Sequence, residues 1–173
     1  MSRSDSILEL LEQKIYNSIN NQLKKLIKPN FKLQKVTDLD LQLVKKLKSE
    51  YGIGGIILDV DETIRKNMMD LPDCNKKWIQ FMKQEFRVII LSNGYDKKIE
   101  EFSKENNLKY LSFATKPLKG NFLKACDNMG LNPENVLLIG DDIIADIYGG
   151  NKCGLITAIV KSVVDEKEHI NLI

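Results

Sequence analysis

Short apolar runs alternate with amphipathic stretches over most of the chain. Continuous apolar runs are typical of strands buried on both faces of a parallel sheet, and they occur at GIILDV, RVIILS, VLLIGD and LITAIV, with a weaker one at KYLSFA. Between these runs, apolar residues recur at helical spacing around Trp78, Ile99, Phe122 and Ile147. The alternation predicts an α/β fold, a Rossmann-like three-layer sandwich with a five-stranded, mainly parallel sheet.

The start of the chain has a different pattern. Residues 5–27 carry apolar side chains at helical spacing until Pro29, which predicts an amphipathic helix whose polar face becomes basic at its end. Such a helix could pack on the domain, bind a partner or lie on a membrane surface, and packing is the favoured interpretation. A second, short helix is expected over 38–49. The predicted division is an N-terminal amphipathic helix (1–28), a main domain (29–165) and a C-terminal tail (166–173).

Composition and charge exclude several classes of protein. The chain has 173 residues, 43% of them hydrophobic and 29% charged, which is ordinary for one globular domain. Its net charge of +2 is too small to indicate a nucleic-acid partner, and no stretch is apolar for long enough to span a membrane. The three cysteines lie far apart, which fits reduced thiols. We expect a cytoplasmic protein, at most in peripheral contact with the inner face of a membrane through residues 5–28.

Polar and charged side chains directly follow three of the predicted strands. In open parallel sheets, ligands bind beyond the carboxyl ends of the strands, so these residues and a lysine from a nearby loop form the candidate site. Taken singly, each has a structural interpretation as a helix cap, a turn residue or a surface lysine. Together they indicate one crevice with two acidic clusters. The candidates are Asp59, Asp61, Thr63, Ser92, Asn93, Lys116, Asp141, Asp142 and Asp146.

Three or more carboxylates in one crevice repel one another unless a cation neutralises them. Oxygen ligands suit Mg²⁺, which completes its octahedral shell with water and a substrate phosphate. A carboxylate with a pKa near ~4 is ionised at neutral pH and is therefore a ready nucleophile toward phosphorus. Serine and lysine side chains then balance the charge on the phosphoryl oxygens during transfer. The pattern predicts Mg²⁺-dependent phosphoryl transfer.

The order and spacing of these residues resemble the four motifs of the haloacid-dehalogenase (HAD) superfamily of phosphotransferases. That superfamily carries D-x-D-x-T after its first core strand, then a serine or threonine, then a lysine, and finally G-D-x-x-x-x-D. Here the corresponding segments read DVDET, SNG, TKP and GDDIIAD. The matching residues are Asp59, Asp61, Thr63, Ser92, Lys116, Gly140, Asp141 and Asp146.

In detail the chain is most similar to the YqeG-like branch, subclass IIIA, whose relatives include phosphatidylglycerophosphate phosphatases. The similarity extends over about residues 28–161. Glu62 and Asp142 replace uncharged residues of the branch pattern and add negative charge near the expected metal. The resemblance implies an HAD-like fold and a Mg²⁺-dependent phosphatase that works through an aspartyl-phosphate.

The resemblance also implies a role for each matched residue. Asp59 would be the nucleophile, and Asp61 would be the general acid toward the leaving alcohol and then the base for the hydrolytic water. The expected metal ligands are Asp59, the backbone carbonyl of Asp61, and Asp141, with Asp146 and Asp142 in supporting positions around them. The expected phosphate-binding groups are Thr63, Ser92, the loop amides at Asn93, and Lys116, which also pairs with Asp59.

The spacing of the motifs leaves no room for a substrate-selecting cap domain. Only 22 residues separate Thr63 from Phe86, and another 22 separate Asn93 from Lys116, and predicted elements use most of them. An uncapped site stays open to solvent and suits a large substrate or a lipid headgroup. Among such substrates, phosphatidylglycerophosphate is the one that we favour. The alternatives are a soluble phosphatase for a small sugar or nucleotide phosphate, and a non-catalytic phosphate- or partner-binding module of the same fold.

Overall fold

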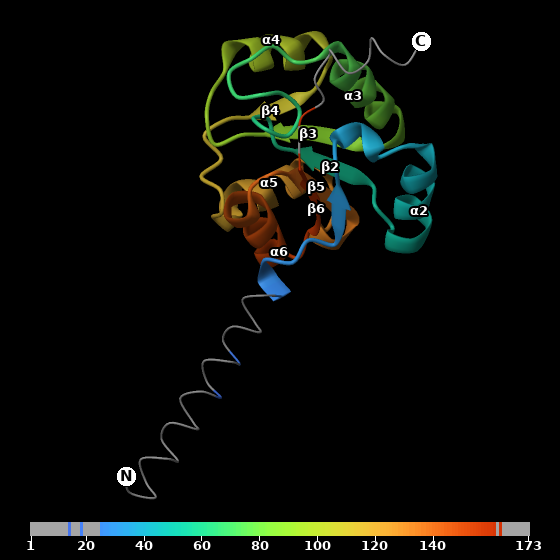
Figure 1. The fold of residues 1–173 in the computed structure, drawn as a ribbon, viewed down its shortest axis with the longest axis vertical. Coiled ribbons are helices and arrows are strands. Elements are labelled where there is room, and N and C mark those ends of the chain that lie inside the picture. The colour runs from blue at the N-terminus through green and yellow to red at the C-terminus, as the bar shows by residue number, and fades with distance from the viewer. Residues whose placement is uncertain (1–13, 15–17, 19–24, 162, 164–173) are drawn as a thin grey trace, which may run out of the picture.

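A six-stranded sheet organises the chain. The computed structural model of the protein describes residues 14, 18, 25–161 and 163 (Figure 1). The strands lie in the order β1-β6-β5-β2-β3-β4, and every neighbouring pair is parallel. Their bounds are β1 Phe31–Leu33, β2 Gly55–Leu58, β3 Arg87–Leu91, β4 Lys109–Leu111, β5 Val136–Gly140 and β6 Ile156–Val160.

The expected number of five strands is wrong by one, because the sequence pattern does not show β1. This strand has three residues and pairs only with β6, where Phe31 lies opposite Ala158. Asn30 joins the same edge, since its side-chain oxygen accepts a hydrogen bond from the Thr157 N–H at 2.9 Å. A strand this short is defined by the neighbour that it pairs with, and three residues are too few to display a period. The other five strands lie where the apolar runs predict them.

Helices cover both faces of the sheet, which confirms the Rossmann-like α/β arrangement. Residues of α3 and α4 pack in one apolar layer and residues of α5 pack in the other, and Figure 1 shows α3 and α4 in the upper part of the molecule and α5 and α6 in the lower left part. Helix α2 begins after Asp40, whose carboxylate accepts a hydrogen bond from the Leu43 N–H, and so begins and ends later than the expected 38–49. The helices are α2 Leu41–Tyr51, α3 Asp73–Glu85, α4 Lys97–Glu105, α5 Lys119–Met129 and α6 Gly149–Cys153. Two 3-10 helices, η1 Val36–Asp38 and η2 Pro133–Asn135, and one π-helix, η3 Ile143–Tyr148, are also found among the described residues.

The central strands are buried on both faces, and their side chains divide between two apolar layers. Ile56 and Leu58 pack in the layer that includes residues of α2, α3 and α4, such as Trp78. Ile57, between them, packs in the opposite layer with Phe122 of α5. Because both faces of the strand are covered, its run of apolar residues is continuous rather than alternating.

The chain reverses its direction of travel across the sheet at β2. Strands β3 and β4 lie on one side of β2, and β5 and β6 lie on the other. Such a reversal opens a crevice at the carboxyl ends of the strands. Only a loop joins β2 to α3, and only α4 intervenes between β3 and β4, so the described residues include no separate cap domain over this edge.

Two of the predicted segments lie largely outside the described residues. The amphipathic helix of 1–28 is described only at residues 14, 18 and 25–28, and the tail of 166–173 is not described at all. Their boundaries therefore stay predictions. Within the described part of the chain, no helix combines the length and the apolar character needed to cross a membrane. The three cysteines are Cys74, Cys126 and Cys153, all free thiols.

Candidate active site

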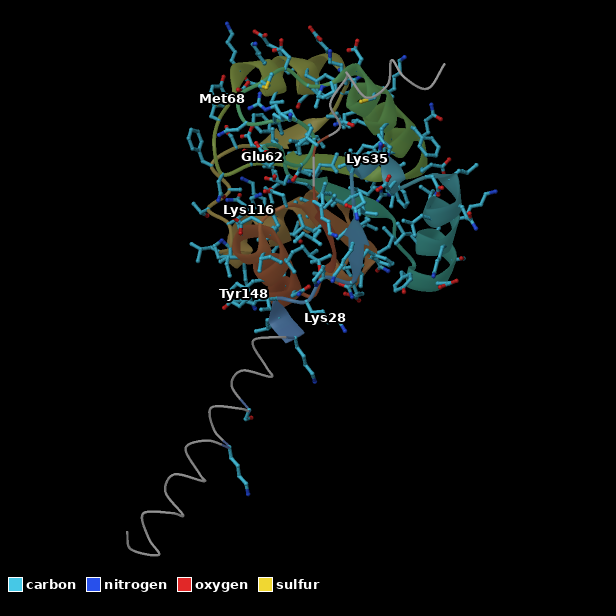
Figure 2. The ribbon with its side chains drawn as sticks, viewed as in Figure 1. Lys28, Lys35, Glu62, Met68, Lys116 and Tyr148 are labelled. Carbon is cyan, nitrogen blue, oxygen red and sulfur yellow. The ribbon has the colours of Figure 1, made fainter. Side chains whose placement is uncertain are left out.

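Four loops at the carboxyl edge of the sheet bring the predicted residues together. Asp59 directly follows β2, Ser92 follows β3, Lys116 lies between β4 and α5, and Asp141 follows β5. Figure 2 shows Lys116 and Met68, which come from two of these loops, on the same side of the molecule. Side chains that are far apart in the sequence therefore meet at this edge, as the strand ends predict.

Lys116 lies at the centre of the charged groups. Its Nζ donates hydrogen bonds to Asp59 Oδ1 at 2.5 Å and to Asp146 Oδ1 at 2.6 Å. All three residues are buried, and Asp146 is only 1% exposed. Burial by itself would lower the pKa of Lys116, but the charges of Asp59 and Asp146 outweigh it and raise that pKa above its ordinary value. Lys116 therefore stays cationic and holds two mutually repelling carboxylates close together.

Thr63 connects the first acidic cluster to the second. Its buried hydroxyl oxygen lies 2.9 Å from Asp59 Oδ2 and 3.3 Å from Asp141 Oδ1. A hydroxyl has one proton to donate, so Thr63 donates it to Asp59 at the shorter distance. The Asp141 carboxyl group then receives little hydrogen bonding from Thr63. Burial, followed by the charge of Asp59, raises the pKa of Asp141 from 3.8 to about 6. Among the described residues, no cationic side chain forms an ion pair with the Asp141 carboxyl group.

The acidic residues form a group that fits a divalent cation. One carboxylate oxygen from each of Asp59, Asp141 and Asp146 lies within 4.8 Å of the others. Burial and the charge of Asp59 also raise the pKa of Asp146, although Lys116 opposes this. Because the fold disfavours so many negative charges here, a bound cation would relieve the repulsion, and an all-oxygen donor set suits Mg²⁺. Asp59 and Asp141 would hold the ion, since Asp146 is the most deeply buried of the three and is only 1% exposed.

We expect Mg²⁺ to stabilise the protein more at neutral pH than at pH 5. The ion binds the ionised carboxylate, and because the pKa of Asp141 is about 6, protons compete with the ion below that pH. Without metal, the folded protein holds a proton on Asp141 more tightly than the unfolded chain does, because the pKa of Asp141 is raised from 3.8 to about 6. The free energy of unfolding should therefore fall as the pH rises through this range. Thermal unfolding with Mg²⁺ or chelator at both pH values measures the difference. An equal or larger Mg²⁺ effect at pH 5 would contradict this account.

Gly140 allows Asp146 to enter the crevice. A Cβ atom at Gly140 would lie 2.3 Å from the Asp146 carboxyl group, so any other residue would displace that side chain. The π-helical η3 carries Asp146, and the second Asp146 oxygen accepts a hydrogen bond from the Asp142 N–H at 3.2 Å. Glycine is therefore required at this position of the G-D-x-x-x-x-D motif because the Asp146 side chain packs against it.

The two acidic residues that depart from the YqeG-like pattern are both engaged by backbone N–H groups. Asp142 caps η3, where its Oδ1 accepts hydrogen bonds from two N–H groups at 2.7 Å each. Glu62 Oε1 accepts a hydrogen bond from the Asn67 N–H at 2.8 Å. Neither carboxylate belongs to the acidic group of Asp59, and the capping interpretation of Asp142 is confirmed. Its expected supporting role toward the metal stays a prediction.

Ser92 and Asn93 form the side of the crevice next to Lys116. Ser92 is buried, and its Oγ accepts a hydrogen bond from the Gly94 N–H at 3.3 Å. Asn93 Oδ1 accepts from the Lys116 N–H at 2.7 Å, and its Nδ2 donates to the Lys116 carbonyl at 3.2 Å. These two bonds join the loop of Lys116 to the loop after β3. The Asn93 side chain thus positions Lys116, a contact that its place in the sequence did not indicate.

Asp61 lies at the rim of the crevice, with its side chain 37% exposed and bonded to Arg65. Its carboxylate is not part of the acidic group, and the expected contact of its backbone carbonyl with the metal stays a prediction. Neither Arg65 nor Asn75 belongs to a motif that the sequence pattern indicates. Asn75 is fully buried on α3 and donates a hydrogen bond to the Ile64 carbonyl at 2.7 Å. A polar residue at a core-facing helical position is the signal that could have found it.

A parallel α/β sheet without a cap, with this aspartate, lysine and threonine constellation at its carboxyl edge, defines a phosphatase of the HAD type. The family model described as HAD-hydrolase-like matches residues 113–172. The Bacillus subtilis protein described as "Probable phosphatase YqeG" is 32% identical over 73% of this chain and 74% of its own. The chain therefore belongs to the YqeG-like branch of the HAD superfamily and is a phosphomonoester hydrolase.

Solved structures agree with the fold. A protein from Legionella pneumophila described as a HAD superfamily (subfamily III A) hydrolase has a TM-score of 0.53 at 16% identity, over 73% of this chain and 75% of its own. The cobalt-bound deoxy-D-mannose-octulosonate 8-phosphate phosphatase of Haemophilus influenzae has a TM-score of 0.51 at 15% identity, over 68% of this chain and 82% of its own. At these identities the similarity confirms the HAD-like fold alone.

Proposed function

We propose that the protein hydrolyses phosphomonoesters through an aspartyl-phosphate on Asp59, with Mg²⁺ as cofactor. The observation that carries the proposal is the buried contact between Asp59 and Lys116 at the carboxyl edge of the sheet. Lys116 and Thr63 together hold the two oxygens of Asp59 in one orientation. Mg²⁺, when bound, supplies the positive charge that lets an anionic phosphate approach an anionic carboxylate.

The chain supplies the groups for two successive displacements. In the first, an Asp59 oxygen attacks phosphorus, the bond from phosphorus to the leaving oxygen breaks, and Asp61 gives that oxygen a proton. In the second, Asp61 takes a proton from a water molecule that attacks phosphorus, and the bond to Asp59 breaks to release phosphate. Lys116, Ser92 and the loop amides at Asn93 balance the charge on the phosphoryl oxygens in both steps.

Exposed apolar side chains on the site loops support an amphiphilic substrate. Tyr95 and Phe113 stack with their ring centroids 6.2 Å apart and their planes 13° apart, and Phe113 is 65% exposed. We call the exposed large apolar residues of these loops the apolar rim: Met68, Met69, Tyr95, Phe113, Leu118, Ile143 and Ile144. All of them lie on segments that follow strands β2 to β5, and exposed apolar side chains that border a site are typical of a binding surface.

We propose that this apolar rim contacts the apolar part of a substrate whose phosphate enters the crevice. Phosphatidylglycerophosphate is the substrate that we favour, because an uncapped site beside an apolar surface suits a headgroup presented by a membrane. A cytoplasmic protein in peripheral contact with the inner face of a membrane would meet that substrate. The predicted contact through residues 5–28 is part of the same proposal, and no nucleic-acid partner is needed.

The substrate proposal predicts a selective effect of the rim. Phosphate release from micellar phosphatidylglycerophosphate should exceed release from sugar and nucleotide phosphates. Phe113→Ser should raise KM for the micelles about tenfold, since about 1.4 kcal/mol is what partial burial of a phenylalanine contributes. It should leave p-nitrophenyl phosphate turnover unchanged. Leu41→Ser, at an exposed apolar residue of α2 outside the site loops, is the matched control and should change neither.

The other outcomes separate the alternatives. Higher kcat/KM on a sugar or nucleotide phosphate than on the micelles would contradict the lipid substrate and favour the soluble phosphatase. An equal effect of Phe113→Ser on the micelles and on p-nitrophenyl phosphate would show that the rim has no role in substrate choice. Absence of Mg²⁺-dependent release from every substrate would favour the non-catalytic binding module.

A further inference from the structure

Arg65 is a buried cation beside the site, and the two displacements described above do not use it. It lies in the loop between β2 and α3, four residues after Asp61, and is only 1% exposed. A guanidinium stays charged even when buried, so its N–H groups need acceptors. Among the described residues, it finds three acceptors: Asp61, Asp96 and the Met69 carbonyl.

The bonds to Asp61 engage one of its two oxygens. Arg65 Nε donates to Asp61 Oδ1 at 2.9 Å, and the Met68 N–H reaches the same oxygen at 3.3 Å. No hydrogen bond from a described residue reaches Asp61 Oδ2. Since the Asp61 side chain is partly exposed at the rim of the crevice, Oδ2 is the oxygen left to meet a leaving group or a water molecule.

The opposite end of Arg65 is anchored to a different loop. Its Nη2 donates to Asp96 Oδ2 at 3.1 Å. Asp96 Oδ1 caps α4 by accepting hydrogen bonds from the Lys98 and Ile99 N–H groups at 2.8 and 3.2 Å. Arg65 therefore links the N-cap residue of α4 to Asp61. A rigid guanidinium can make both contacts in fixed directions, whereas a lysine ammonium is a single point on a flexible stem.

We propose that Arg65 is a positioning residue for Asp61, which holds Oδ1 so that Oδ2 alone exchanges protons during the reaction. This rests on the proposed function, in which Asp61 is the acid and then the base. In the first step the Oδ2 proton moves to the leaving oxygen as its bond to phosphorus breaks. In the second step Oδ2 takes a proton from the attacking water. Displacement of Oδ2 from its position should lower the rate of the first step most when the leaving group needs that proton.

The test compares kcat/KM of Arg65→Met on phenyl phosphate and on p-nitrophenyl phosphate. The value of kcat/KM reports the first displacement, in which the leaving group departs. Phenolate leaves poorly and needs a proton, so we expect a loss of about 10²-fold there. The loss on p-nitrophenyl phosphate should be much smaller, because p-nitrophenolate leaves with little help. In an Asp61→Asn background, Arg65→Met should cause no further loss, since nothing remains to be positioned.

Two further variants keep the test decisive. Lys98→Met removes a neighbouring ion pair with Asp70 at the same edge, and it should leave both kcat/KM values unchanged. If circular dichroism shows that Arg65→Met is unfolded, Arg65→Lys carries the comparison. It retains a buried cation but cannot bond Asp61 and Asp96 in the same fixed directions, so it should show the same contrast between substrates.

The results that would overturn the proposal differ from those that would overturn the proposed function. Equal losses on the two substrates, or a loss that adds to that of Asp61→Asn, would mean that Arg65 only stabilises its loop. In that case the wild-type enzyme is active and the proposed function stands. A wild-type protein that releases no phosphate from either substrate with Mg²⁺ would refute the proposed function, and the role of Arg65 with it.

Discussion

Replacing Asp59 with asparagine is expected to abolish phosphate release while the fold persists. An amide cannot form the aspartyl-phosphate, so kcat should fall by at least about 10³-fold. The amide oxygen can still accept a hydrogen bond from Lys116, and the amide NH₂ can donate to the Thr63 hydroxyl, so both partners of the present carboxylate keep a contact. Mg²⁺-dependent phosphate release and thermal unfolding, measured on the same preparation, test the two halves of this expectation.

Asp70→Asn is the matched control for Asp59→Asn. Asp70 follows the same strand, but it is exposed and pairs with Lys98 instead of a site residue. Its replacement should leave turnover at the wild-type level. If Asp59→Asn retained most of the wild-type Mg²⁺-dependent release, another residue would have to be the nucleophile, and the proposed mechanism would be wrong.

Lys116→Met is expected to have the largest effect on stability. Its side chain is 3% exposed and is hydrogen bonded to both Asp59 and Asp146, so its loss leaves two buried carboxylates without their cation. Breaking one side of a buried ion pair costs about 3–5 kcal/mol in the free energy of unfolding. Activity should fall by at least about 10²-fold, because no other described side chain balances the phosphoryl charge from this position. Urea unfolding at neutral pH in chelator measures the loss of stability.

Mg²⁺ should restore part of the stability of Lys116→Met but not its activity. The ion can neutralise Asp59 and Asp141, yet it cannot take the place of the ammonium group beside Asp146. Lys119→Met, at an exposed lysine that begins α5, is the control and should unfold like the wild type. If Lys116→Met lost no more stability than Lys119→Met, the buried ion pairs would not be what holds the carboxylates together.

The central strands could be predicted from the sequence because strands buried on both faces consist almost entirely of apolar residues. Strands such as β2 and β5 pack against helices on both faces, so every residue is apolar and the run stands out. The edge strand β1 was missed for the opposite reason. It has three residues and one neighbour, and its existence depends on β6, about 125 residues further along the chain. Pairing at such a distance is not encoded in a local pattern.

The candidate site was predictable to the level of which residues meet, because parallel strands end at one edge. The motif order alone predicts that Asp59, Ser92 and Asp141 lie at that edge, and the structure has them there. The hydrogen bonds among them were not predictable. Lys116 is 57 residues from Asp59 and 30 from Asp146, and its contacts depend on how three loops pack.

By itself, the sequence determined the fold class and the edge of the sheet that carries the chemistry, because strand burial and the spacing of a few polar residues are local properties of the chain. The nucleophile that we propose is what the resemblance to the HAD motifs implies. Only the tertiary structure decided that Asn93 holds the Lys116 backbone and that Arg65 links Asp61 to Asp96. The reason is physical: a buried polar group must find its partner wherever packing places one, and the sequence does not record that place.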